Sequence, residues 1–191
     1  MAVRIRSRFH RGGRSRTPAE LASVVATLAW KLAIDSMRNM RNAQYDIDIG
    51  RPYFEFVSEY MVFLATAADR IAHRELDAEP RIAFTTALAV RMAEIVADNS
   101  DMLLGAATPD ECRRDFLDRF NRHGADYAEF DYGADGPDFG FRRYFAACLR
   151  AVLPEKDQLW VIDQAMDIEA PAAIKALEKT LAGLFGAASG E

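Results

Sequence analysis

Two apolar stretches decide the fold of this chain: PYFEFVSEYMVFLATAADRIAHREL at residues 52–76 and PRIAFTTALAVRMAEIVADNSDMLL at residues 80–104. In the first stretch, apolar side chains recur every three or four residues, as at Tyr53, Val57 and Tyr60. This spacing is the period of an amphipathic α-helix and does not fit the alternation of a β-strand. Each stretch therefore predicts one long helix.

A link of only three residues, Asp77 to Glu79, joins the two stretches. Short connections between helices normally join antiparallel neighbours, so we expect a helical hairpin over 52–76 and 80–104. Charged side chains within both arms, such as Glu59 and Asp98, would be costly inside a lipid bilayer. We therefore do not expect an integral membrane protein.

Prolines divide the rest of the chain. A helical pattern begins at each of Pro18, Pro52, Pro80, Pro109, Pro137, Pro154 and Pro171. Proline suits the first turn of a helix, where its missing N–H is not needed. Thr17 with Glu20, and Thr108 with Glu111, also have the spacing of capping boxes. The sequence predicts an all-α, compact bundle of about seven helices, the others lying at 18–42, 109–122, 137–153, 154–168 and 171–186.

Charge separates a short tail from the body of the chain. Residues 1–16 hold six arginines and no acid, and the chain's 24 basic residues less these six leave 18 against 29 acidic ones. We expect a disordered basic tail at 1–16, a single all-α domain at 17–186 and a frayed terminus at 187–191. The acidic body disfavours a broad nucleic-acid surface, so only the N-terminal arginines are suited to an acidic partner such as nucleic acid or anionic lipid.

The two cysteines, Cys112 and Cys148, match neither a metal-knuckle spacing nor a redox spacing. They are typical of reduced cysteines in a cytoplasmic protein. The tail has no apolar run of the length found in secretory signals, so we expect no export and a cytoplasmic location.

One acidic constellation suggests a site. In a hairpin that turns near residue 78, Glu55 falls level with Asp101 and Glu59 falls level with Asp98. Four carboxylates at one level are suited to Mg²⁺ or Mn²⁺, which prefer oxygen ligands. The four-residue spacing of Glu55 and Glu59 differs from the three-residue spacing of all-α nucleotide pyrophosphatases, so we infer no membership of that family. The alternative is an ordinary solvated face.

Other chemistry is poorly supported. Asp69 and His73 lie one helical turn apart, which is more typical of a local hydrogen-bonded pair than of a metal site. The sequence has no Gly-rich phosphate loop, no Ser/His/Asp order and no Cys/His pair at a useful spacing.

These absences favour a non-catalytic helical interaction or adaptor module without a cofactor, which recognises a protein partner or forms a homodimer through an apolar or alanine-lined face. The alternative is a Mg²⁺-dependent nucleotide hydrolase, or a metal- or ligand-binding bundle, that uses the acids of the hairpin.

Overall fold

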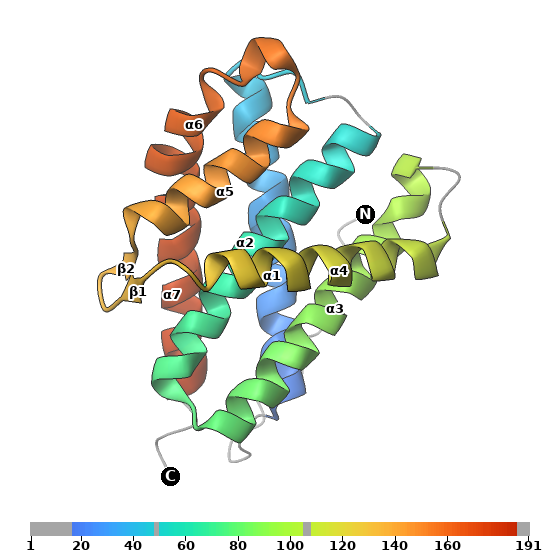
Figure 1. The fold of residues 1–191 in the computed structure, drawn as a ribbon. Coiled ribbons are helices and arrows are strands. Elements are labelled where there is room, and N and C mark those ends of the chain that lie inside the picture. The colour runs from blue at the N-terminus through green and yellow to red at the C-terminus, as the bar shows by residue number, and fades with distance from the viewer. Residues whose placement is uncertain (1–16, 48–49, 105–107, 187–191) are drawn as a thin grey trace, which may run out of the picture.

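The computed structural model describes residues 17–47, 50–104 and 108–186 of the chain, with the side chains of 100–104 outside this description. Over these residues the molecule is an all-α bundle, which confirms the predicted fold class (Figure 1). The described elements are α1 (Pro18–Asn42), α2 (Arg51–Glu75), α3 (Ala78–Leu104), α4 (Pro109–Tyr127), β1 (Tyr132–Gly133), β2 (Gly136–Pro137), α5 (Phe139–Val152), a 3₁₀ turn (Glu155–Asp157), α6 (Val161–Gln164), a π-helical segment (Ala165–Glu169) and α7 (Ala170–Gly186).

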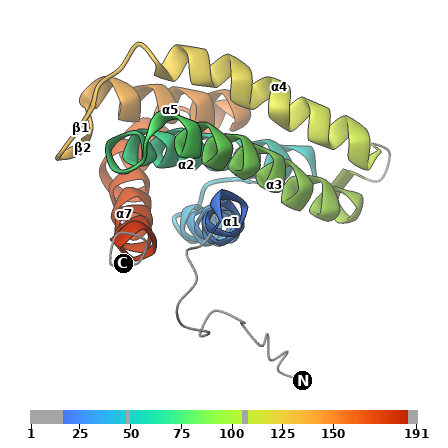
Figure 2. The same cartoon turned by 90° about the horizontal axis from the view of Figure 1, so that it is seen from below.

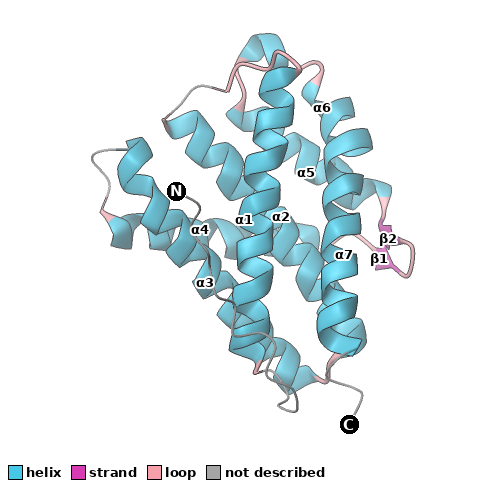
Figure 3. Cartoon of the chain, turned by 180° about the vertical axis from the view of Figure 1, so that it is seen from behind, coloured by secondary structure: helices cyan, strands magenta, loops and turns pink. Residues whose placement is uncertain are grey.

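The helices form three layers. Figure 2 shows the hairpin of α2 and α3 in the middle, with α4 and α5 on one side and α1 and α7 on the other. The view from behind has α1 and α7 in front (Figure 3). The expected antiparallel hairpin therefore forms the centre of the bundle, with helix bounds within two residues of those predicted.

Helix α2 is the most enclosed element. Every residue from Phe56 to Ala68 is buried, including the polar Glu59 and Thr66. Glu59 is one of the four acids for which the sequence left a solvated face as the alternative, and it does not meet water, because α4 crosses that side of the hairpin. The Thr66 hydroxyl donates a hydrogen bond to the carbonyl of Val62 at 2.8 Å, which satisfies it inside the core. Glu59 finds its partners on other helices.

Two predicted helix starts, those of α1 and α4, are confirmed, and the packing of α1 changes a further expectation. Thr17 and Thr108 both form complete capping boxes, with Glu20 and Glu111. The alanine edge of α1 is fully buried and consists of Ala22, Ala26, Ala29 and Ala33. Small side chains allow close approach of a neighbouring helix, and α3 is the neighbour with which α1 packs most extensively. This alanine face is therefore buried within the chain and is not accessible to a second copy.

Proline 171 does not start a helix. Over the described residues the chain forms six helices rather than seven, because α6, the π-helical segment and α7 run on without a break. A proline ring clashes with the carbonyl four residues earlier in a regular α-helix, and a π-turn widens the helix locally. The N–H of Ala170 accordingly donates to the carbonyl of Ala165, five residues earlier. The helix thus accommodates Pro171 without ending.

The segment between α4 and α5 also differs from the prediction. Helix α4 continues through Gly124 to Tyr127 instead of ending near Arg122. Pro137 lies in a small antiparallel hairpin, with Tyr132 opposite it, and α5 begins two residues later. Asp138 caps α5 by accepting a hydrogen bond from the N–H of Phe141 at 2.7 Å. The longer α4 brings its last turns against α2 and α5.

Aromatic rings fill the junction of α2, α4 and α5. Phe63 stacks on Phe145 with ring centroids 4.0 Å apart, and Tyr60 meets Phe145 edge-on at 5.2 Å. Tyr127 of α4 packs against Phe141 at 4.5 Å. These contacts fix the three helices relative to one another. No described helix is both long enough and apolar enough to cross a membrane.

Candidate functional site

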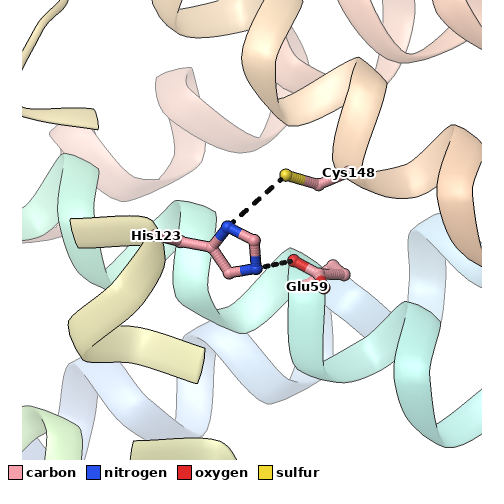
Figure 4. Close-up of side chains that lie close together, drawn as sticks. All are labelled: Glu59, His123 and Cys148. Carbon is pink, nitrogen blue, oxygen red and sulfur yellow. Dashed lines mark hydrogen bonds and ion pairs between the residues drawn. The ribbon is translucent and has the colours of Figure 1, made fainter. Parts of the chain in front are cut away.

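A cluster of polar side chains lies beside this aromatic junction. Glu59 comes from α2, His123 from α4 and Cys148 from α5, and Figure 4 shows the three side chains facing one another. Arg119 and His123 lie one turn apart on α4, so both face Glu59. Tyr144 and Cys148 are likewise one turn apart on α5, on the opposite side of the imidazole. Three separate helices therefore build the cluster.

Glu59 is the acid of the cluster and is only 6% exposed. The guanidinium of Arg119 donates to Oε1, and the Nε2 atom of His123 lies 3.4 Å from Oε2. Burial raises the pKa of Glu59, but the hydrogen bond from His123 and the charge of Arg119 outweigh it, so the pKa is below its ordinary value of 4.5. Glu59 is therefore a buried carboxylate in its charged form.

The other imidazole nitrogen of His123 faces α5. Its Nδ1 lies 2.6 Å from the hydroxyl of Tyr144 and 3.8 Å from Sγ of Cys148. The same hydroxyl donates to the carboxylate of Asp126, whose Oδ2 lies 3.9 Å from Nδ1. Both ring nitrogens thus have polar neighbours, and Asp126 forms the solvent-exposed edge of the cluster.

Cys148 is not poised for nucleophilic catalysis. It is 9% exposed, and burial together with the negative charge of Glu59 raises the pKa of its thiol to about 12. It also lies near the C-terminal end of α5, where the helix dipole disfavours a negative charge. Reactive cysteines need a stabilised thiolate, so the Cys148–His123 contact does not have the electrostatics of a thiol hydrolase.

As ligands, the same residues form a coherent set. One donor atom from each of Glu59, His123 and Cys148 lies within 4.8 Å of the other two, the only such group of three among the described side chains. Carboxylate, imidazole and thiolate are the ligands that Zn²⁺ uses in proteins.

The structure distributes the four predicted acids differently. Glu55 pairs with Arg51 at 2.7 Å, Asp98 is exposed, and the side chain of Asp101 lies outside the described residues. Glu59 is directed to α4 and α5 rather than to α3. The three described acids do not form a ligand group, and the magnesium site formed by all four stays a prediction.

Asp69 does not pair with His73 as the sequence predicted. Its carboxylate accepts from Arg81 of α3 at 3.0 and 2.5 Å, and from the hydroxyl of Thr85 at 2.6 Å. Arg81 also lies 3.3 Å from Nδ1 of His73. A guanidinium that binds both carboxylate oxygens has replaced the local hydrogen bond.

Sequence reasoning missed His123 and Cys148. They lie 25 residues apart on different helices, so no local spacing links them. Placing the end of α4 near Arg122 also hid the pattern. In a helix that continues to Tyr127, the spacing of Arg119, His123 and Asp126 places all three on one face.

An open groove adjoins the cluster on the outer face of α5. It measures about 370 Å³ and is lined by Phe130, Gly140, Arg143, Tyr144, Ala147 and Arg150. Tyr144 therefore separates the groove from His123. The ring of Phe130 covers Gly140 closely enough that an added Cβ would lie 2.5 Å from it.

Comparison with known proteins supplies no relative. The chain matches no protein-family model, and neither the curated proteins nor the solved structures provide a match.

Proposed function

We propose that this protein is a non-catalytic helical interaction module that associates with a second copy of itself. The observation that carries the proposal is an exposed apolar pair, Leu159 and Trp160, which are 80% and 68% exposed. Both residues lie on the surface turn between the 3₁₀ segment and α6. Large apolar side chains grouped on a surface are typical of protein contacts, and tryptophan is enriched at interface centres.

The turn that carries this pair is held firmly. Asp157 is buried and accepts a hydrogen bond from the backbone N–H of Asp46 at 2.7 Å. Lys156 forms an ion pair with Asp46 at 2.7 Å, and the side chain of Gln158 donates to the carbonyl of Leu153 at 3.0 Å. These bonds connect the turn to the segment before α2, so little conformational entropy is lost when a partner binds.

A second copy is the simplest partner for a small patch. A two-fold axis through the turn would pair Trp160 of one protomer with the same surface of its partner. The exposed acids Glu155 and Asp163 flank the patch and would face each other across that axis. We therefore expect a weak dimer, since the patch is small and the acids repel, and one that salt strengthens by screening.

The proposal also covers the cellular compartment and the role of residues 1–16. Both cysteines are unpaired, which suits the reducing conditions of the cytoplasm. We retain the six arginines of residues 1–16 as the proposed contact for an acidic partner, nucleic acid or anionic lipid, separate from the dimer surface.

Sedimentation velocity from low micromolar to near-millimolar protein tests the proposal. We expect the weight-average sedimentation coefficient of the wild type to rise with concentration, and that of Trp160→Ser to stay at the monomer value. Ile82→Ser is the matched control, because Ile82 is 65% exposed but lies on α3. A wild type that remains monomeric throughout, or an Ile82→Ser variant that also loses association, contradicts the assigned surface.

A further inference from the structure

We infer that Glu59, His123 and Cys148 form a binding site for one transition-metal ion of the zinc class. The inference is independent of the proposed dimer, because the cluster lies at the junction of α2, α4 and α5 and shares no residue with the Leu159–Trp160 turn. It also differs in chemistry from the predicted magnesium site, which used only carboxylates.

The spacing of the donor atoms supports this inference. Zinc bonds of about 2.0–2.3 Å at tetrahedral angles place neighbouring donor atoms roughly 3.3–3.8 Å apart. The two contacts of the imidazole use different nitrogens: Sγ of Cys148 lies 3.8 Å from Nδ1, and Oε2 of Glu59 lies 3.4 Å from Nε2. Only one nitrogen binds a given ion, and one donor atom from each of the three residues lies within 4.8 Å of the other two. In Figure 4 the sulfur faces one ring nitrogen and the carboxylate faces the other. A rotation of the ring that turns one nitrogen between them completes the set of three.

The surroundings orient these donors. Arg119 binds Oε1 of Glu59, and Oε2 faces His123, so Oε2 is the oxygen available to an ion that takes the place of this contact. Such outer partners of metal ligands fix the ligand's orientation and strengthen binding. All three side chains project from helices whose aromatic contacts hold them together, so the ligands are placed by rigid elements rather than by loops. The exposed Asp126 marks the open side, where water or that carboxylate can take the fourth position.

The charges of the cluster are compatible with a bound divalent cation. When the thiol of Cys148 binds a metal it loses its proton to solvent, and the sulfur carries a negative charge. The cluster then holds the negative charges of Glu59, Cys148 and Asp126 against the single positive charge of Arg119. A bound divalent ion offsets the charge of the thiolate that forms when the metal binds.

The ligand types set the expected selectivity. Thiolate and imidazole are soft and borderline donors that favour Zn²⁺ and Co²⁺, whereas Mg²⁺ requires mostly oxygen ligands. We therefore expect Zn²⁺ and Co²⁺ to bind at this cluster and Mg²⁺ not to compete at equal concentration.

Cobalt absorption of the full-length, chelator-treated protein tests the site. We expect Co²⁺ to produce a thiolate-to-cobalt charge-transfer band that Zn²⁺ abolishes and Mg²⁺ does not. Cys148→Ser and His123→Gln should lose the band, and Cys112→Ser should keep it. Cys112 is the matched control, because it is the other buried cysteine and is not part of the cluster.

Thermal unfolding gives a second readout of binding. Zinc at a hundredfold excess over Kd should raise the Tm of the wild type by roughly 5–10 °C.

A second measurement on the wild type remains decisive if a variant fails to fold. In mildly denaturing conditions, Zn²⁺ should slow alkylation of Cys148 at least tenfold more than alkylation of Cys112, as read by peptide mass spectrometry. No cobalt band in the wild type, a band that survives Cys148→Ser, or equal protection of both cysteines would overturn the inference.

Discussion

Helix α2 carries two buried or half-buried carboxylates that each bind an arginine of another helix, and their surroundings differ. Asp69, near the hairpin turn, pairs with Arg81 of α3. Glu59, in the middle of the helix, pairs with Arg119 of α4. The hydroxyl of Thr85 also donates to Asp69, so the carboxylate of the first pair is fully hydrogen-bonded by α3.

The carboxylate of the second pair, Glu59, has no such hydroxyl partner among its described contacts. On the far side of Glu59 lies the imidazole of His123, which leads on to Cys148. The difference follows from which helix covers α2 at each level. Near the turn α3 lies directly against it, whereas farther along α4 and α5 meet over it (Figure 1). In this fold an ion pair therefore becomes a candidate site where a third helix adds donor groups.

The largest effect is expected from removing the acid of the cluster. Glu59→Ala leaves Arg119 and His123 facing an apolar gap, and loss of one partner of a buried pair is strongly destabilising. Because Arg119 is partly exposed, we expect a loss of about 2–4 kcal/mol in the free energy of unfolding, measured by urea denaturation. The control is Glu55→Ala on the same helix, whose partner Arg51 is exposed and whose loss should cost less than ~0.5 kcal/mol. Equal losses in the two variants would contradict the contrast.

A smaller loss of stability is expected at the Asp69–Arg81 pair. Asp69→Ala removes hydrogen bonds to Arg81 and Thr85, but both the aspartate and the arginine side chains reach solvent. We expect a loss of about 1–2 kcal/mol, less than for Glu59→Ala, in the same denaturation assay. A larger loss at Asp69 than at Glu59 would reverse the ranking that burial predicts.

The pH dependence of stability sharpens the comparison further. The folded-state pKa of Glu59 lies below 4.5, so its contribution is fully present above about pH 4.5 and is lost as the pH falls through the lower folded value. The difference in unfolding free energy between the wild type and Glu59→Gln should therefore be constant at higher pH and shrink below about pH 4.5. A difference that grows on acidification would contradict a charged, paired Glu59. Unfolding midpoints at closely spaced pH values supply the measurement.

Local signals predicted the fold well. The two capping boxes, at Thr17 and Thr108, set two helix starts, and the apolar period set the hairpin. The rule that proline begins a helix failed at Pro171, where a π-turn accommodates the ring. Local signals therefore locate helices, but they do not reveal that a helix can continue through a proline by forming a π-turn.

The site was only partly predictable. Glu59 was singled out as one of four acids at one level of the hairpin, but its expected neighbour was Asp98 of α3. The predicted register required α2 and α3 to stay in contact along their whole length, whereas α4 covers α2 at the level of Glu59. The crossing of α4 depends on tertiary packing, and no spacing in the sequence encodes the meeting of His123 with Cys148.

The most direct test of the contrast between the two pairs is Co²⁺ binding by matched neutral variants of the two carboxylates. We expect Glu59→Gln to weaken Co²⁺ binding at least tenfold, measured by titration of the charge-transfer band, and Asp69→Asn to leave the Kd unchanged. Absence of the band in the wild type, or an equal change of Kd in both variants, would contradict the assignment of the Glu59 cluster as the site.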